Sequence, residues 1–467
     1  MKSTHARNGV MMAAALSVFI LTGMAAFAAE YRIEIAQVRW ELKPGLTTVA
    51  WAYGGTVPGT PIIVRPGERV KVEVVNRLPD ATNIHWHGLV LPNDQDGPFL
   101  EIGPGAAFSY DFSAGESGTY WYHPHMMPVL PQLDRGLYAP FIILAPEDGR
   151  YSGDHTYILD DWLLDVRGRR LEGVAAGEME RFGNVETVNG KTDEAIEPLV
   201  LKSGELHKLR FINASTAAVH TLLTDGPLFR VTHTDGHPLG IPYLTDRIVL
   251  APGERIDAEL FASGKEGDRF RIVSTRADLG IAIPVIYGKG RVPEVASPFV
   301  PPDSANKPTP SGTKPDFTLE LSTAMGMMGG GMMGGGSMDH GMGGGGMGGG
   351  GSGMTRWTIN GRSFPATEVI EVIAGKAVTM RFYNKDTMSL MMGHRMDHPM
   401  HIHGTKFRVL SINGTVPKGE IWKDTIPVPA GGWVDIAFVM QNPGDWVLHC
   451  HVIDHEDGGM MAIVRAR

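Results

Sequence analysis

The only cysteine of this 467-residue chain lies between two histidines, in His449-Cys450-His451. Side chains of an extended strand alternate between its two faces, so Cys450 would point one way and both histidines the other. One short strand would then serve two metal sites, back to back. His455 and Met460 follow closely. Thiolate, imidazole and a weak thioether are ligands of a mononuclear blue-copper site, which needs one further histidine.

Histidines elsewhere in the chain occur as His-x-His pairs. Eight imidazoles belong to four such pairs, in the order His85 and His87, His123 and His125, His401 and His403, His449 and His451. His398, just ahead of the third pair, is left over and completes a set of two histidines, one cysteine and one methionine. Ten of the 18 histidines are accounted for in this way. A chance pair would carry little weight, but four pairs with the last enclosing the sole cysteine are a specific signal.

The four motifs together resemble those of the multicopper oxidases, the family of laccases and bacterial cuprous oxidases. They read HWHG from His85, HPH from His123, HPMHIHG from His398 and HCHVIDHEDGGM from His449. The resemblance covers essentially the whole chain after its N-terminal segment. It implies an enzyme that removes electrons singly from a substrate and reduces O2 to water with four of them. It also implies four copper ions as cofactors.

The resemblance assigns a role to each predicted ligand. The type 1 copper would be held by His398, Cys450, His455 and Met460, and the type 2 copper by His85 and His401. The two type 3 coppers would be held by His87, His123 and His451, and by His125, His403 and His449. Glu456 and Asp96 match carboxylates that supply protons near bound oxygen. Asp94 is a rival for Asp96 that the sequence leaves open.

Strand patterns and length predict an all-β chain. Alternation in Arg69-Val70-Lys71-Val72 and frequent Gly and Pro suit sandwiches of short strands. A turn glycine before a strand recurs three times, which indicates three copies of one unit. With the resemblance, we expect three consecutive cupredoxin-like Greek-key β-sandwich domains. We place them at 30–146, 147–300, which has no copper ligands, and 316–467, with a Pro-rich linker at 301–315.

The N-terminus and the charge indicate an exported protein. Lys2 and Arg7 precede an apolar run, and Ala26-Phe27-Ala28 is a small-residue cleavage site, so residues 1–28 are predicted to be a signal peptide. No Arg-Arg pair occurs there, which favours the Sec route to the periplasm or the outside. No later segment could span a bilayer. The formal net charge of −9 argues against a nucleic-acid partner. We expect a monomer.

Methionine is concentrated in two places in the last third. Residues 324–354 are almost all Gly and Met, a composition that cannot bury a core and predicts a flexible insert. A second cluster precedes His398. Thioethers are soft ligands that select Cu(I). The candidate Cu(I) ligands are Met325, Met327, Met328, Met332, Met333, Met338, His340, Met388, Met391, Met392, His394 and Met396. Bacterial cuprous oxidases carry similar inserts, although His394 here stands where their site has an Asp.

The predicted activity is oxidation of Cu(I) to Cu(II) with O2 as acceptor, serving copper tolerance. A laccase that oxidises phenols, small aromatic donors or Mn(II) is the alternative. A non-catalytic copper sequestration protein would explain the methionines but not the four ordered His-x-His pairs. A copper-free relative of the fold is disfavoured, because each predicted ligand is present. A copper nitrite reductase would not need the His-Cys-His element.

Overall fold

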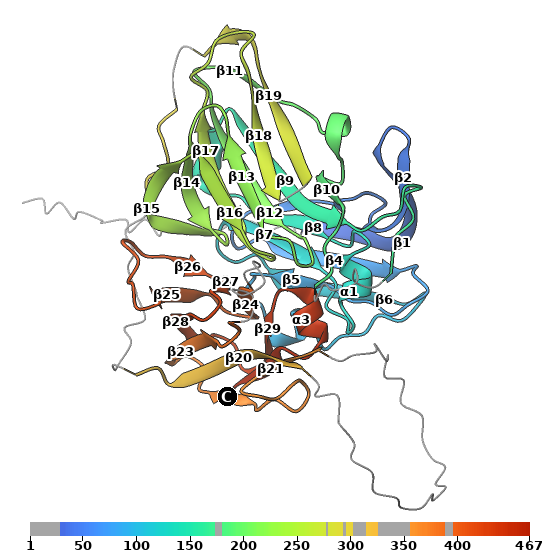
Figure 1. The fold of residues 1–467 in the computed structure, drawn as a ribbon, viewed down its shortest axis with the longest axis vertical. Helices are drawn as coiled ribbons and strands as arrows, with labels where there is room; N and C mark the ends of the chain where they lie inside the picture. The colour runs from blue at the N-terminus through green and yellow to red at the C-terminus, as the bar shows by residue number, and fades with distance from the viewer. Residues whose placement is uncertain are drawn as a thin grey trace, which may run out of the picture.

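The computed structural model describes residues 29–172, 180–276, 279–292, 296–301, 314–325, 355–387 and 396–467. The predicted signal peptide 1–28, most of the predicted linker and most of the Met/Gly-rich insert lie outside these residues. The regular elements of the described residues are nearly all strands, as the sequence predicts, and they form three units of two packed sheets each (Figure 1).

The first unit packs two four-stranded sheets, in the orders β2-β1-β4-β6 and β3-β8-β7-β5. Its alternating segment forms β4, in which Val70, Val72 and Val74 are fully buried. Trp86 lies in the same core. The strands are β1 (Ala29–Lys43), β2 (Leu46–Tyr53), β3 (Ile62–Val64), β4 (Arg69–Asn76), β5 (His85–His87), β6 (Ala107–Ser113), β7 (Gly118–His123) and β8 (Ala139–Ile143). The helical turns are η1 (Asn93–Gln95), α1 (Leu130–Leu133) and η2 (Pro146–Arg150).

The second unit packs a six-stranded sheet, β10-β9-β12-β17-β14-β15, on a five-stranded one, β11-β19-β18-β13-β16. Its core holds Leu209, Phe211 and Val231. The elements are β9 (Gly153–Trp162), β10 (Val185–Val188), η3 (Asp193–Ala195), β11 (Leu199–Ser203), β12 (Leu206–Asn213), β13 (His220–Thr224), β14 (Phe229–Thr234), β15 (His237–Thr245), β16 (Arg247–Leu250), β17 (Arg255–Phe261), β18 (Arg269–Arg276) and β19 (Leu279–Arg291).

The third unit has the same sheet sizes as the second, in the orders β21-β20-β23-β28-β25-β26 and β22-β30-β29-β24-β27. Cys450 and Met460 lie in its core. The elements are β20 (Phe317–Met325), β21 (Thr355–Ile359), β22 (Ile370–Val372), β23 (Ala377–Asn384), β24 (His398–Ile402), β25 (Phe407–Ile412), β26 (Trp422–Lys423), β27 (Thr425–Val428), β28 (Trp433–Val439), β29 (Gly444–Cys450), α3 (Ile453–Asp457) and β30 (Met461–Ala466).

The structure corrects the predicted start of the insert. We expected the insert to begin at residue 324, but β20 continues to Met325, which pairs with Thr355 at the start of β21. This pair and the pair of Ala324 with Arg356 extend the strand past the predicted boundary, because antiparallel pairing satisfies backbone groups that a free loop would leave to water. Residues 326–354 therefore connect two neighbouring strands.

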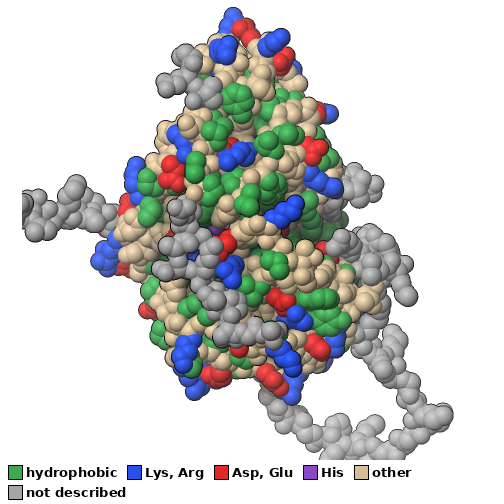
Figure 2. All heavy atoms as spheres, turned by 90° about the vertical axis from the view of Figure 1, so that its left-hand side faces the viewer, with side chains coloured by type: hydrophobic (Ala, Val, Ile, Leu, Met, Phe, Trp, Pro, Cys, Tyr) green, Lys and Arg blue, Asp and Glu red, His purple; other side chains and the backbone are tan. Residues whose placement is uncertain are grey.

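The three units meet around the predicted ligands. In Figure 1 the blue first unit lies between the green second unit and the orange-red third unit near α1, and β5 lies close to β24 and β29. Figure 2 shows acidic and basic side chains scattered among apolar ones, and almost no histidine, on the face that it presents. All ten predicted histidine ligands are at most 2% exposed. No helix among the described residues is long and apolar enough to cross a membrane.

Candidate metal centres

Antiparallel pairing brings the histidine pairs of each unit together. In the third unit β24 pairs with β29, so that His401 lies opposite His449 and Met400 opposite Cys450. In the first unit β5 pairs with β7, and His85 lies opposite His123. All these residues are buried within their strands. The first and third units therefore each contribute two adjacent histidine pairs from one sheet.

A mononuclear site forms around Cys450. Its Sγ lies 3.7 Å from His398 Nδ1 and 3.5 Å from His455 Nδ1, and these two nitrogens are 3.1 Å apart. All three residues are fully buried, and so is Met460, whose carbonyl accepts a hydrogen bond from the Cys450 amide. Burial raises the pKa of the Cys450 thiol. A thiolate at this position needs a bound cation, which is what a metal would supply.

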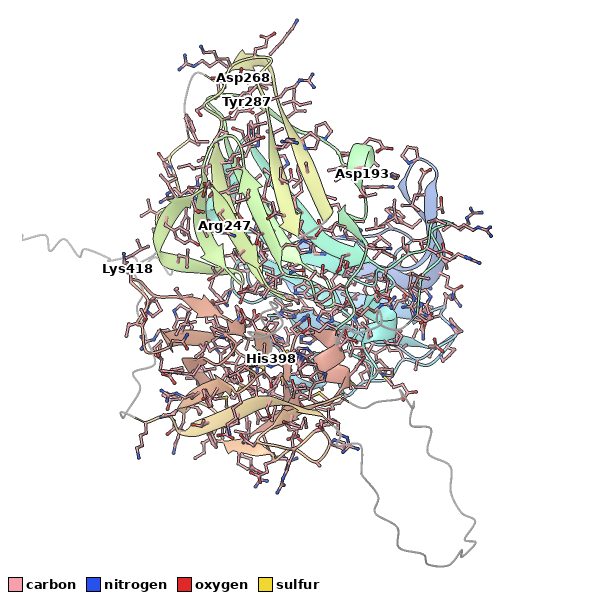
Figure 3. All side chains as sticks on the ribbon, viewed as in Figure 1. Asp193, Arg247, Asp268, Tyr287, His398 and Lys418 are labelled. Atoms are coloured by element: carbon pink, nitrogen blue, oxygen red, sulfur yellow. The ribbon has the colours of Figure 1, made fainter. Side chains whose placement is uncertain are left out.

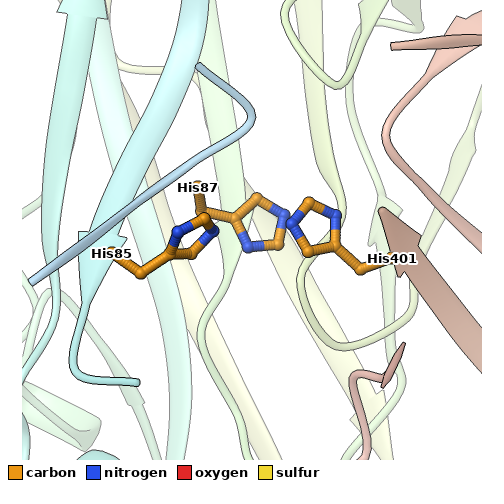
Figure 4. Close-up of side chains that lie close together, drawn as sticks. All are labelled: His85, His87 and His401. Atoms are coloured by element: carbon orange, nitrogen blue, oxygen red, sulfur yellow. The ribbon is translucent and has the colours of Figure 1, made fainter. Parts of the chain in front are cut away.

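The other eight histidines form three groups, of which the first two share His87, and within each group the candidate ligand atoms lie within 4.8 Å of one another. The groups are His85, His87 and His401, then His87, His123 and His451, then His125, His403 and His449. Figure 4 shows the first group, with side chains from β5 and β24 converging. The second and third groups are the two triads that the resemblance assigns to a pair of coppers. Every group except the mononuclear one combines residues of the first and third units.

The nitrogen spacing in these groups fits metal coordination. His125 Nε2 lies 3.4 Å from His449 Nε2, and His403 Nε2 lies 3.2 Å from that same atom. A first-row metal binds imidazole nitrogen at about 2 Å, which places two nitrogens on one ion roughly 3.3 Å apart. His85 Nε2, His401 Nε2 and both ring nitrogens of His451 are buried without a hydrogen-bond partner among the described residues. Such buried, unpartnered nitrogens are expected where a metal belongs.

Burial lowers the pKa of six of these eight histidines and so favours the neutral imidazole that a metal ligand must be. Desolvation and the neighbouring histidines lower the pKa of His123, His403 and His451 far below the usual value. Burial also lowers the pKa of His125, to about 3, although Glu456 raises it in part. The donor set of eight buried imidazoles therefore fits a cluster of copper ions.

Of the two aspartates in the first unit, the structure places Asp96 at the cluster. Asp96 is 2% exposed, and its Oδ2 lies 2.8 Å from His403 Nδ1. Its main-chain oxygen lies 3.1 Å from His85 Nδ1. Asp94 is exposed on the short η1 turn. The turn thus directs one carboxylate to water and the other to two predicted ligands.

Glu456 faces the cluster from the third unit. It is fully buried, with Oε1 3.2 Å from His125 Nε2 and Oε2 3.0 Å from His449 Nδ1. Neither oxygen makes a well-aligned hydrogen bond to a described residue. Its place on α3, next to His455, lets one short helix serve both centres.

Sequence reasoning missed Asp424, which connects all three units. Its carboxylate lies 3.2 Å from His87 Nε2, and its carbonyl oxygen 2.9 Å from His401 Nδ1. Arg255 of the second unit donates two hydrogen bonds to this carboxylate, at 2.7 and 2.6 Å, and a third to the carbonyl of Thr119 in the first unit. No local motif marks this contact, since Arg255 and Asp424 are 169 residues apart.

Two further carboxylates were missed at the mononuclear site. His398 Nε2 lies 3.0 Å from Asp386 Oδ2, and His455 Nε2 lies 2.9 Å from Glu180 Oε1. Each predicted ligand thus directs Nδ1 towards Cys450 and Nε2 towards a carboxylate. Figure 3 labels His398 near α3. Glu180 comes from the second unit, so that unit also reaches the mononuclear site.

Only one of the candidate Cu(I) ligands can be placed with its side chain. Met396 is partly buried against the core, and its sulfur lies 3.7 Å from Thr323 Oγ1. Met325 is the last residue of β20. The other candidates lie outside the described residues, namely Met327, Met328, Met332, Met333, Met338, His340, Met388, Met391, Met392 and His394.

Comparison with known protein families supports the same reading over most of the chain. Three family models, each described as multicopper oxidase, match residues 34–148, 153–283 and 347–467. The multicopper oxidase MmcO of Mycobacterium tuberculosis is 31% identical over 440 residues, which cover 87% of this chain and 81% of that protein. The multicopper oxidase mco of Staphylococcus aureus is 26% identical, covering 93% and 88% respectively.

Solved structures show the same fold. A multicopper oxidase from Pseudomonas thermotolerans superimposes with a TM-score of 0.75 at 25% identity, covering 95% of this chain and all of that one (100%). A multicopper oxidase from Campylobacter jejuni, called a metallo-oxidase, superimposes with a TM-score of 0.73 at 24% identity, covering 94% and 91%. The three-domain cupredoxin-like architecture predicted from the sequence is thereby confirmed.

Proposed function

Because this chain belongs to the multicopper oxidase family, we propose that it oxidises Cu(I) to Cu(II) and reduces O2 to water. Members of this family are oxidoreductases that use O2 and carry four coppers. When bound, these coppers supply a one-electron acceptor at the mononuclear site and a multi-electron reductant of O2 at the cluster. Membership of a family of enzymes also argues against a protein that only stores copper.

The proposed ligand roles follow the clusters. His398, Cys450, His455 and Met460 would hold the type 1 copper. His85 and His401 would hold the type 2 copper, and the two triads already named would hold the type 3 pair. Cys450 is covalently bonded to His449 and His451, so the backbone of one strand end connects the two centres. Asp96 and Glu456 are the proposed proton donors, because both contact cluster histidines from the side.

One observation carries the choice of Cu(I) as substrate. Asp386 contacts His398 Nε2, and Thr323 Oγ1 bridges from Asp386 Oδ2, at 2.8 Å, towards the sulfur of Met396. A carboxylate and a thioether thus lie together on the outer side of a predicted type 1 ligand. A soft sulfur beside an anionic oxygen suits a cuprous ion that must give up one electron. Asp386 would fill the role for which the sequence offered His394.

A paired substitution tests this assignment. Met396→Leu keeps the volume but removes the soft donor, so kcat/KM for Cu(I) should fall roughly tenfold or more, as for loss of a metal-supporting group. Phenol oxidation should be nearly unchanged. Met127→Leu is the matched control, because Met127 is 41% exposed and belongs to the first unit. Equal rates with Cu(I) for both variants would exclude Met396 from the substrate site.

The insert can be tested separately, because the structure defines where to cut. Met325 and Thr355 are paired neighbours, so residues 326–354 can be replaced by Asn-Gly, which closes an antiparallel hairpin. We expect the deletion to lower Cu(I) oxidation and to leave or raise phenol oxidation. Equal loss of both activities would refute an insert that collects Cu(I) and covers the mononuclear site.

Phenols are a second candidate substrate, favoured by Glu180. Its carboxylate contacts His455 Nε2, and its side chain is 17% exposed. A phenol releases a proton when it loses an electron, and an accessible carboxylate at this nitrogen is placed to accept that proton. Glu180→Gln should lower the phenol rate and spare the Cu(I) rate. The opposite pattern would exclude Glu180 as that base.

Export and copper tolerance complete the proposal. Signal-peptide removal by the Sec pathway would leave a mature periplasmic or secreted chain that starts near Ala29. N-terminal sequencing of protein from an intact culture tests the cleavage. Growth of a deletion strain on copper salts tests the physiological role, and unchanged copper sensitivity would contradict it.

A further inference from the structure

A groove lined by arginines lies between the first and second units, at the β1–β2 hairpin. It is about 530 Å³ in volume, within the range of roughly 300–1,000 Å³ for small-ligand sites. Its charged lining comprises Arg39, Arg135, Arg167, Arg169, Arg170 and a single acidic residue, Glu172. No lysine contributes. This concentration of positive charge contrasts with the net charge of −9 of the whole chain.

One wall of the groove is a face of the β1–β2 ladder. Gln37 pairs with Trp51 and Arg39 with Val49, so these side chains share one face. Trp51 is 4% exposed and lies under Arg135, whose guanidinium carbon is 4.7 Å from the ring centroid. The Trp51 amide also donates a hydrogen bond of 2.8 Å to the Arg135 carbonyl. Arg135 is therefore fixed over the tryptophan.

The opposite wall is a tight loop of the second unit. Asp165 Oδ1 accepts the amides of Arg167 and Arg169, at 2.8 and 2.9 Å. Gly168 has a φ of +76°, and a Cβ there would lie 2.2 Å from the carbonyl oxygen of Thr47 on β2. Only glycine allows this close approach. The loop is thus seated against the hairpin, and its arginines are held at the groove.

The positive charge of the groove is only partly neutralised. Arg169 pairs with Asp165, Arg170 pairs with Asp134 and Glu172, and Arg135 lies 4.0 Å from Glu172. Arg39 and Arg167 make no ion pair with any other described residue. The pKa of Arg135 is lowered by burial and then by the neighbouring charge of Arg170. Like charges held together in this way gain from a bound anion.

We propose that this groove is a binding site for a multiply charged phosphate-type oxyanion, a free oligophosphate. Planar guanidinium groups match phosphate oxygens with paired hydrogen bonds, which lysines do not, and five arginines suit more than one phosphate. A hollow between two walls admits a short chain of phosphates. The flat headgroup layer of a membrane would not enter it.

Calorimetry with the copper-loaded full-length chain and sodium tripolyphosphate tests the proposal. We expect saturable binding of about one ligand per chain. Arg39→Gln combined with Arg167→Gln should weaken binding at least ~10-fold, because these are the two unpaired guanidinium groups. Arg39→Lys with Arg167→Lys keeps the charge but not the paired geometry, and should weaken binding by an intermediate factor.

A matched control removes the same charge elsewhere. Arg247 and Arg269 are exposed on β16 and β18, and Figure 3 labels Arg247. The double substitution Arg247→Gln with Arg269→Gln should leave the affinity for tripolyphosphate unchanged. Equal weakening in both glutamine pairs, or no saturable binding to the unaltered chain, would overturn the proposal. Binding to phosphatidylglycerol vesicles that the Arg39 and Arg167 substitutions abolish, without tripolyphosphate binding, would also overturn it and identify a membrane ligand. Oxygen consumption by each variant shows whether that variant is still folded.

Discussion

The mononuclear site and the eight-histidine cluster lie back to back at the end of β29, yet they are assembled differently. The predicted type 1 ligands all lie between residues 398 and 460, within one sandwich. The cluster takes four histidines from the first unit and four from the third. Arg255 of the second unit then holds Asp424 against two of them. One centre requires folding of a unit, and the other also requires docking of three.

This difference shows what a unit without copper ligands contributes. Arg255 and Asp424 are both fully buried, so neither charge is compensated by water. Removing one partner of a buried pair leaves an uncompensated charge, although the pair itself adds little net stability. The pair therefore serves to fix the position of Asp424, and through it His87 and His401, more than to stabilise the fold.

The largest expected effect tests whether the mononuclear site can lose its copper while the cluster keeps its own. Cys450→Ser removes the thiolate, so turnover with Cu(I) and with phenols should be abolished. Copper analysis should fall from four ions per chain, the complement of the family, to three. The cluster should stay loaded, because its ligands do not include Cys450. Full turnover in this variant, or markedly fewer than four coppers in the loaded unaltered chain, would contradict the proposed function.

The next effect tests docking of the second unit. Arg255→Met leaves Asp424 buried without its partner, which should lower the free energy of unfolding by about 3–5 kcal/mol. It should also weaken cluster copper binding by roughly 10–100-fold, as for other groups that orient metal ligands. Copper titration with type 2 and type 3 spectroscopy would measure this. The mononuclear copper should be retained.

Arg210→Met is the matched control for that substitution. Arg210 is also a buried arginine of the second unit, and it pairs with Asp154, Asp148 and Asp257, which do not contact predicted ligands. Its loss should cost comparable stability and leave copper binding unchanged. If both variants lose cluster copper equally, the Arg255 contact has no specific role.

A smaller effect is expected from a close backbone approach to the cluster. Gly253 has a φ of +84°, and a Cβ there would lie 2.8 Å from His451 Cδ2. Gly253→Ala should therefore displace the His451 ring and lower type 3 copper occupancy. Gly267 has a similar φ of +88°, with open space around it. Gly267→Ala should therefore cost only the backbone strain, about 1–2 kcal/mol. Equal copper content in the two variants would argue against ring displacement.

The smallest effect concerns acid and the junction of the first two units. Burial would raise the pKa of Asp257, but Lys208 and Arg210 hold it below its usual value. Its Oδ1 accepts a hydrogen bond of 2.6 Å from Thr119 in the first unit. A carboxyl whose pKa is lower in the folded than in the unfolded state stabilises the protein at pH values above its unfolded-state pKa, which is near 3.9. This stability is lost as the pH falls through the folded-state pKa.

Calorimetry of the copper-free chain between pH 6 and 3 measures that loss. The Tm should fall as pH drops below about 5. Asp257→Asn should show a lower Tm at pH 6 and a weaker dependence on acid. An unchanged slope would place the acid sensitivity elsewhere.

The choice between Asp94 and Asp96 shows where sequence reasoning stopped. The two carboxylates are two residues apart, and only the η1 turn decides that Asp96 meets His85 and His403. The sequence did not identify Asp386 as the carboxylate beside His398, because the pattern ahead of His398 favoured His394. Both cases, the open choice at Asp96 and the missed Asp386, concern which side chain a turn or loop directs inward, and that depends on packing more than on local composition.

The sequence by itself determined the ligand chemistry. Thiolate, imidazole and thioether donors are properties of the residues, and alternation at Cys450 is a property of any extended strand, so both could be read without coordinates. The three-unit β architecture followed from strand patterns and motif order. Tertiary structure alone decided which charges besides Asp96 and Glu456 support the ligands. Arg255, Glu180 and Asp424 reach them from distant segments, because their contacts depend on how three folded units dock.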